Sequence, residues 1–163
     1  MNISHDKKNW LIEPDAITDF EGADYGFLSN FHEASFELDG KVWSTVEHAF
    51  QAAKCEDAQE AENIRHATTP SKAKKMGRAA KMRGDWEQIK DEAMYRAVYA
   101  KFSQNPDLAQ ALEATEDRIL VEGTRWHDNI WGQCWCGCHG NAGQNRLGQI
   151  LMIVRDELKK TSV

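Results

Sequence analysis

Three polar side chains recur at helical spacing in the stretch Ser44–Lys54. Glu47, Gln51 and Lys54 are spaced i, i+4 and i+7, so an α-helix would place them along one stripe. The neighbouring stripe is apolar. An acid and an amine are unusual beside a face that packs into a core, and such groups can carry proton transfer. The alternative is that Glu47 only closes a capping box with Ser44 and that Lys54 is a solvated charge. The helix alone leaves both interpretations open.

A strongly basic segment lies at residues 72–83, where six of twelve positions are lysine or arginine. The commoner role of such a run is a solvated helix face. The alternative is phosphate binding by Arg78 and one lysine, because a guanidinium group forms bidentate contacts with phosphate.

Residues 123–145 are rich in glycine, tryptophan and cysteine without a hydrophobic period, which predicts a long loop. Asp128 stands between Trp126 and Trp131, so its carboxylate could be partly desolvated and suited to proton transfer. The alternative is an aspartate that caps a turn, with the tryptophans in the core.

Cys134, Cys136 and Cys138 precede His139 and raise the question of a zinc site. Their spacing is tighter than that of the usual ligand pairs, and no second pair follows. Reduced, packed thiols are therefore the favoured interpretation, and no metal or organic cofactor is expected. A cysteine nucleophile is also unsupported, because no partner base can be named.

These side chains need elements that position them, and the pattern predicts mostly helices. A hairpin is expected over 35–43 around Asp39-Gly40, the pair that a type I′ turn prefers. A strand at 118–122 could pair with it. Capping residues and apolar periods predict the helices at 44–54, 57–66, 70–84, 86–102, 105–114 and 145–159. The fold class is therefore α+β, a mostly helical domain with a small antiparallel sheet.

The length of 163 residues predicts a single domain over 1–163, with a mobile segment at 1–12. The net charge of −6 argues against a global basic surface for nucleic acid. No run approaches the roughly 18 apolar residues of a membrane helix, and the N-terminus does not resemble a signal peptide. A cytoplasmic protein without membrane partners is the default expectation.

Taken as a set, short motifs spread over residues 25–158 resemble the NADAR family. Two departures are Thr115-Glu116, where Thr-Gly is more usual, and the cysteines, where other members have a glycine-rich loop. The matching motifs are Phe27-Leu28-Ser29-Asn30-Phe31, Glu47-His48-x-x-Gln51-x-x-Lys54, Lys75-x-Gly77-Arg78, Asp85-Trp86, Met94, Lys101-Phe102, Glu122, Asp128-x-x-Trp131-Gly132 and Gly143-x-Asn145-x-Leu147-Gly148-x-x-Leu151-Met152-x-x-Arg155.

The resemblance implies an enzyme that cleaves a C–N bond at an anomeric carbon. The family includes N-glycosidases that act on riboflavin-pathway intermediates and hydrolases that remove ADP-ribose from modified guanine. It implies one pocket with Glu47, Lys54 and Asp128 as catalytic residues and Trp131 beside them. The implied substrate-binding residues are Phe27, Asn30, His48, Gln51, Arg78, Trp86, Trp131, Gly132 and Asn145.

The leading substrate is ADP-ribose attached to guanine, as a nucleotide or in nucleic acid. The alternatives are a phosphoribosylamino-pyrimidine of riboflavin synthesis and a non-catalytic ADP-ribose-binding module. Two chemical routes are open. A carboxylate can stabilise the positive sugar during attack by water, or the amine of Lys54 can form a Schiff base after the sugar ring opens.

Overall fold

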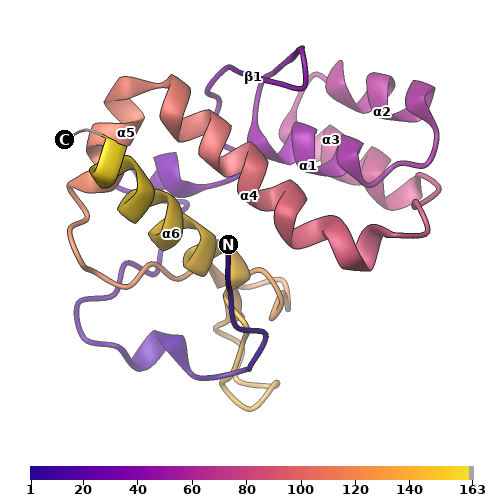
Figure 1. The fold of residues 1–163 in the computed structure, drawn as a ribbon. Coiled ribbons are helices and arrows are strands. Elements are labelled where there is room, and N and C mark those ends of the chain that lie inside the picture. Colours follow the sequence, from indigo (N-terminus) through magenta and orange to yellow (C-terminus); the bar gives the residue numbers. More distant parts are fainter. Residues whose placement is uncertain (162–163) are drawn as a thin grey trace. The chain divides into compact units, whose positions relative to one another are not determined.

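The computed structural model describes residues 1–161, and its elements follow the predicted helix-rich order (Figure 1). Six α-helices and one antiparallel hairpin in this part of the chain confirm the α+β class. The chain contacts form two compact units, the central unit of residues 30–106 and the terminal unit of residues 1–29 and 107–161. The helices are α1 (Val46–Ala53), α2 (Ala58–Arg65), α3 (Pro70–Ala79), α4 (Trp86–Gln104), α5 (Pro106–Glu113) and α6 (Arg146–Thr161).

The central unit begins with the predicted hairpin, formed by β1 (Phe36–Leu38) and β2 (Lys41–Trp43). Phe36 lies opposite Trp43 in its antiparallel register. Asp39 and Gly40 take φ values of 53° and 73°, the left-handed conformations that a type I′ turn requires. The hairpin leads directly into α1.

Helix α1 is buried over seven of its eight residues, because α2, α3 and α4 all pack against it. Its N-cap is Thr45, whose hydroxyl accepts the N–H of His48 at 3.2 Å, and not the predicted Ser44. The N–H of Glu47 donates to the carbonyl of Asn30, so the predicted capping box is wrong. Both Glu47 and Gln51 are buried in the central unit, because the helices around α1 cover them.

Helices α3 and α4 differ in detail from the prediction. Helix α3 begins at Pro70, where the predicted helix over 70–84 begins, with Thr69 as its N-cap, but it ends at Ala79. Helix α4 begins at Trp86, yet Asp85 makes no side-chain capping bond and pairs with Arg83 instead.

One lysine of α4 is enclosed. Lys101 is 1% exposed, with its amine 4.9 Å from the centroid of the Phe102 ring. Burial lowers the pKa of Lys101 to about 7, because an ammonium ion loses its hydration inside a protein.

The N-terminal residues of the terminal unit make contacts from Ser4 onward, and the expected mobility of residues 1–12 stays a prediction. Ser4 exchanges two hydrogen bonds with Gln149, and Lys8 pairs antiparallel with Gly143. Trp10 is buried and its indole N–H donates to the carbonyl of Gly143 at 3.0 Å.

Short strands and α6 complete the terminal unit. The predicted strand at 118–122 is reduced to a bridge between Leu120 and Ile17, so the expected pairing with the hairpin is wrong. β3 (Gly123–Thr124) and β4 (Gln133–Cys134) pair in parallel. The apolar stripe of α6 is buried, as its period predicted, and consists of Leu147, Ile150, Leu151, Val154 and Leu158.

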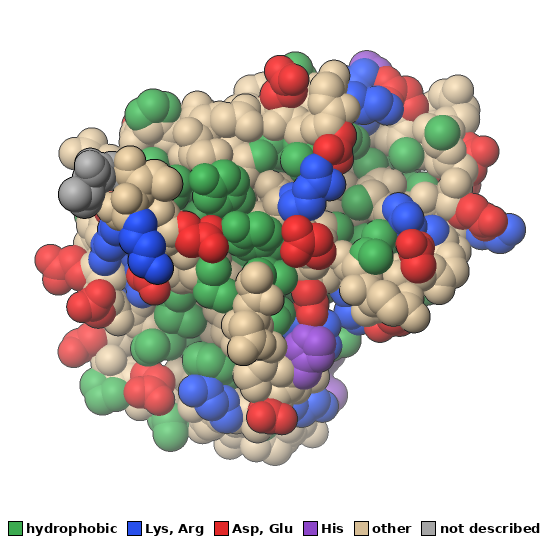
Figure 2. Space-filling model, in the orientation of Figure 1, with side chains coloured by type: hydrophobic (Ala, Val, Ile, Leu, Met, Phe, Trp, Pro, Cys, Tyr) green, Lys and Arg blue, Asp and Glu red, His purple; other side chains and the backbone are tan. Residues whose placement is uncertain are grey.

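The surface mixes charges of both signs. Lys90 pairs with Glu87 within α4, and Arg96 of α4 pairs with Asp39 in the turn of the hairpin. Figure 2 shows acidic and basic side chains interspersed over the visible face. Among the described residues, no helix combines the length and apolarity needed to cross a membrane.

Candidate active site

A carboxyl group is enclosed at the N-terminal end of α1. Glu47 is 5% exposed, and its Oε1 accepts a hydrogen bond from the side-chain amide of Gln51 at 2.8 Å. Desolvation raises the pKa of Glu47, and this effect exceeds the opposing effects of the Gln51 bond and of nearby Lys74 and Lys54. The acid form of this carboxyl therefore persists to higher pH than at the surface, as a general acid requires.

An amine with the opposite shift lies two turns further on. Lys54 is half-buried and takes a helical conformation at the C-cap of α1. Desolvation lowers the pKa of Lys54, and the positive charge of Arg78 adds to this, although Cys55 and Glu47 oppose it. The lowered pKa favours the neutral amine, which is the nucleophilic form.

The amide between these two groups lies against the backbone of α3. A Cβ atom on Gly77 would lie only 2.0 Å from Oε1 of Gln51, so this position has no room for a side chain. Oε1 of Gln51 is buried and has no hydrogen-bond partner within residues 1–161. A buried acceptor of this kind is costly to leave unpaired, and a donor on a bound molecule would satisfy it.

Two cations of α3 contribute to the electrostatics of this pair. Lys74 and Arg78 are spaced i, i+4, which places them on one stripe. Lys74 acts on Glu47 and Arg78 acts on Lys54. Arg78 was predicted together with an unspecified lysine, and the i, i+4 spacing from Arg78 is consistent with Lys74.

An aromatic ring beside Lys74 was also missed. The amine of Lys74 lies 5.7 Å from the centroid of the Phe31 ring, and Phe31 is 37% exposed. The family resemblance implied Phe27, from the same aromatic segment, as a substrate-binding residue. Phe27 is half-buried in the 3₁₀ helix Gly26–Leu28 of the terminal unit.

Three predicted substrate-binding residues have internal partners, which favours structural roles for them. Nδ1 of His48 lies 2.8 Å from the Thr45 hydroxyl, and its Nε2 lies 2.9 Å from the Ala67 carbonyl. The indole of Trp86 packs on Phe50, with ring centroids 5.1 Å apart. The amide of Asn30 donates to the sulfur of Met94.

Asp128 caps a turn in the terminal unit. Its Oδ1 accepts the N–H groups of Ile130 and Trp131 at 3.0 and 2.9 Å, which matches the turn alternative of the sequence analysis. Trp126 is 43% exposed, so the accompanying expectation of a core tryptophan is wrong at that position. The expected cleft shared by Asp128, Trp131, Glu47 and Lys54 stays a prediction.

Gly132 and Asn145 organise the start of α6. The amide of Asn145 accepts the N–H of Glu122 and donates to the carbonyl of Leu120. Its own N–H donates to the carbonyl of Gly132. Gly132 has no room for a Cβ, which would lie 2.1 Å from the Glu122 carbonyl oxygen.

A group of side chains able to hold a metal ion lies in the loop at 127–139. His127, Cys136, Cys138 and His139 converge there, and Cys134 lies close by. Cys134 is buried as expected, but Cys136 and Cys138 are exposed, so the expectation of packed thiols is wrong for these two.

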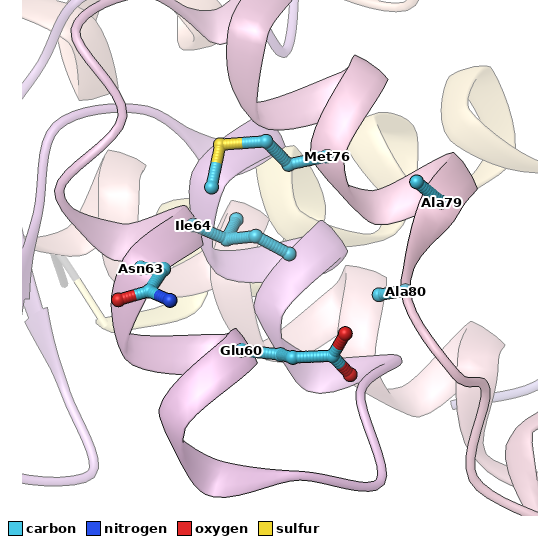
Figure 3. A pocket seen from close by; sticks show the side chains of 6 residues that line it. All are labelled: Glu60, Asn63, Ile64, Met76, Ala79 and Ala80. Atoms are coloured by element: carbon cyan, nitrogen blue, oxygen red, sulfur yellow. The ribbon is translucent and has the colours of Figure 1, made fainter.

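A pocket of about 220 Å³ lies between α2 and α3. Figure 3 shows its lining side chains, of which Glu60 is ionisable and the others are an amide and four apolar groups. It contains neither Glu47 nor Lys54, and Glu60 is its only ionisable lining side chain.

Comparisons with known proteins place the chain in a family. Residues 18–159 match the NADAR domain family. The chain is 42% identical over 151 residues to the N-glycosidase YbiA of Escherichia coli, covering 90% of this chain and 91% of that protein. The NMR structure of E. coli YbiA superimposes with a TM-score of 0.80 and 39% identity, covering 93% of this chain and 89% of that one.

Two further relatives carry informative names. The N-glycosidase Npun_R5314 of Nostoc punctiforme is 38% identical over 140 residues, which cover 83% of this chain and 86% of that protein. The riboflavin biosynthesis protein VVA0006 of Vibrio vulnificus is 38% identical over 153 residues, which cover 93% of this chain but 38% of that longer protein. The matches span most of the chain at well above 30% identity, and the chain belongs to the NADAR family.

Proposed function

We propose that this protein is an N-glycosidase, a hydrolase that cleaves the C–N bond between an amine or base and the anomeric carbon of a sugar phosphate. The observation that carries the proposal is the pair on α1. Glu47 has a raised pKa and Lys54 a lowered one, so acid and nucleophile coexist on one helix. The N-glycosidase names of two relatives support the same class of reaction.

The pair supports a Schiff-base route. When the sugar of a glycosylamine opens, its anomeric carbon becomes an imine carbon. The neutral amine of Lys54 adds to this carbon and displaces the original amine, which leaves after it takes a proton from Glu47. Water then hydrolyses the Lys54 imine, releasing the sugar aldehyde and the free lysine.

Direct displacement by water is the competing route. It needs a carboxylate near the positive sugar and no amine, and Glu47 or Asp128 would then be the essential group. The lowered pKa of Lys54 favours the first route, because direct displacement gives a neutral lysine no task.

Two nucleotide substrates fit this chemistry. The family resemblance favours ADP-ribose on guanine, while the name of the Vibrio relative favours a phosphoribosylamino-pyrimidine. Either would bring phosphate to the cations Lys74 and Arg78 and a flat base to an aromatic side chain. A non-catalytic binding module would need neither Glu47 nor Lys54.

The substrate class can be tested directly. The purified protein is incubated with ADP-ribosylated guanosine and, separately, with the phosphoribosylamino-pyrimidine, and the released base is measured by chromatography. We expect release from one of them at a rate that depends on Glu47. Binding of both compounds without release from either would favour the non-catalytic module.

The Schiff base should be trappable. Borohydride added during turnover should reduce the imine and leave the sugar on Lys54, detected by mass spectrometry of the peptide. Lys54→Ala should lower the rate by about three orders of magnitude or more, and Lys54→Arg should not restore it, because guanidinium stays charged. Full activity in Lys54→Ala would leave direct displacement by water as the route.

The substitution Glu47→Gln should change how the stability of the protein depends on pH. Because the pKa of Glu47 is raised in the folded protein, this group stabilises the fold fully below pH 4.5, its ordinary pKa. This stabilisation is lost as the pH rises through the pKa of Glu47 in the folded protein. Glu47→Gln stays neutral and can keep the bond from Gln51. The stability of the native protein should therefore fall relative to the variant as pH rises, in urea unfolding at several pH values.

The same Glu47→Gln variant should lose most of its activity and the alkaline limb of its pH–rate profile, because the amide cannot donate the proton. Glu21→Gln, at an exposed position, is the control and should change neither property. A variant that is as active as the native protein would exclude Glu47 as the acid.

The cations of α3 should act on substrate binding. Lys74→Ala and Arg78→Ala should each raise KM about tenfold or more, with a smaller effect on kcat, because each removes a charge-assisted phosphate contact. Lys72→Ala removes an exposed charge from the same helix and should leave KM unchanged. If all three variants had the KM of the native protein, the basic side chains of α3 would be a solvated face without a role in substrate binding.

A further inference from the structure

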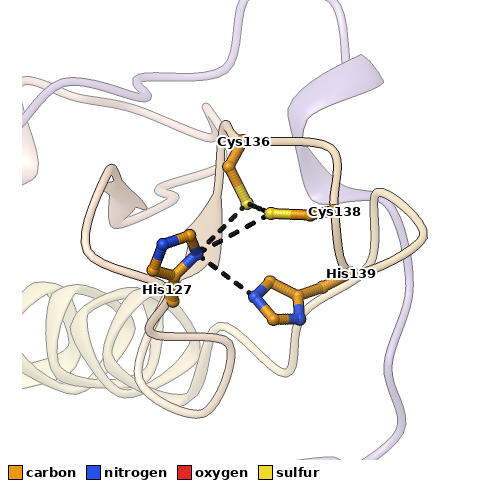
Figure 4. Close-up of side chains that lie close together, drawn as sticks. All are labelled: His127, Cys136, Cys138 and His139. Atoms are coloured by element: carbon orange, nitrogen blue, oxygen red, sulfur yellow. Dashed lines mark hydrogen bonds between the residues drawn. The ribbon is translucent and has the colours of Figure 1, made fainter.

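Four metal-binding side chains meet in the loop at 127–139 of the terminal unit (Figure 4). One nitrogen or sulfur atom from each of His127, Cys136, Cys138 and His139 lies within 4.8 Å of the other three. The centre of the group is Nδ1 of His127. It lies 3.4 Å from the sulfur of Cys136, 3.8 Å from that of Cys138 and 3.2 Å from Nε2 of His139.

Hydrogen bonding does not account for this arrangement. An imidazole nitrogen is either one donor or one acceptor, so Nδ1 of His127 can satisfy a single neighbour. The other two of these three atoms would then face it without a bond to this nitrogen. A cation among the four atoms satisfies all of them at once, because imidazole nitrogen and thiolate sulfur are the ligands that zinc prefers.

We propose that His127, Cys136, Cys138 and His139 bind one Zn²⁺ ion in a tetrahedral site. Tetrahedral zinc places two nitrogens about 3.3 Å apart and a nitrogen and a sulfur about 3.5 Å apart, from bond lengths of about 2.0 and 2.3 Å. The nitrogen–nitrogen distance of 3.2 Å and the nitrogen–sulfur distances of 3.4 and 3.8 Å match these values.

The two sulfurs must move apart by more than an ångström to share an ion. They lie 2.6 Å apart, and tetrahedral coordination needs about 3.8 Å. Both cysteines are exposed, so rotation about their side-chain bonds can supply this movement.

The backbone of the loop brings these ligands together despite their tight spacing. Gly137 separates the two cysteines and has a φ of 70°, a conformation that favours glycine and turns the chain so that both sulfurs face the same side. His127 has a φ of 65°, which is uncommon for a residue with a side chain. Such local strain is typical of functional positions.

The role of the ion would be structural. Four protein ligands leave no open position for water or substrate, as in other structural zinc sites. Cys134 is buried, its sulfur accepts the N–H of Cys136 at 3.4 Å, and it lies 4.0 Å from Nδ1 of His127. We assign Cys134 a positioning role, in which its sulfur holds the backbone of Cys136 through this hydrogen bond.

Metal titration of the 163-residue chain tests the site. Protein that has been reduced and freed of metal with a chelator is titrated with Co²⁺ and then with Zn²⁺. We expect one ion per chain, thiolate-to-cobalt charge-transfer bands, ligand-field bands of a tetrahedral ion, and loss of these bands when Zn²⁺ displaces Co²⁺. Proton release should accompany binding, because the thiols ionise. Octahedral spectra or no binding would overturn the proposal.

Single substitutions identify the ligands. Cys136→Ser, Cys138→Ser, His127→Asn and His139→Asn should each weaken Zn²⁺ binding by about 100-fold or more. Cys55 lies in the central unit, so the variant Cys55→Ser should bind Zn²⁺ as the native protein does. Cys134→Ser should have an intermediate effect. If Cys134→Ser abolished binding while Cys138→Ser did not, the proposed ligand set would be wrong.

Thermal unfolding provides a readout that is independent of the spectra. Zn²⁺ should raise Tm of the native protein and of Cys55→Ser, but not of His139→Asn, whose side chain is exposed and can change without disturbing the core. An equal rise in Tm for His139→Asn would place the ion elsewhere.

Discussion

The burial of a carboxyl group inside the central unit is the constraint on which the candidate site depends. Burying an ionised carboxylate is unfavourable because the charge loses its hydration, and two features reduce this desolvation penalty here. The group keeps its proton to higher pH, and the amide of Gln51 together with nearby cations stabilises the charge that forms when the proton leaves. The surroundings of α1 therefore hold a proton that can be given up, which a surface glutamate does not offer.

Local features of the chain allowed the fold class to be predicted. The pair Asp39-Gly40 specifies a hairpin because both residues adopt left-handed conformations in its turn. Pro70 after Thr69 marks a helix start because proline lacks only an N–H that the first turn leaves unpaired. The strand at 118–122 failed because its pairing depends on contacts between distant segments, which β-propensity does not encode.

The candidate site was predictable only in part, for a similar reason. Periodicity places Glu47, Gln51 and Lys54 on one stripe, but it does not reveal that three helices enclose that stripe. The proximity of Lys74 to Glu47 arises from the packing of α3 on α1. The proximity of His127 to Cys136 and Cys138 could not be read from the sequence, because His127 precedes the cysteines by several residues and only the course of the loop brings them together.

The close approach at Gly77 has a consequence for how the site can vary. A side chain at this position would collide with Gln51 and force its side chain to move, so a residue without a functional group constrains the site. Even a methyl group there would push the amide away from Glu47 and remove a bond that counteracts desolvation. The pKa of Glu47 therefore depends partly on the absence of a side chain at Gly77 in α3, which leaves room for the amide of Gln51.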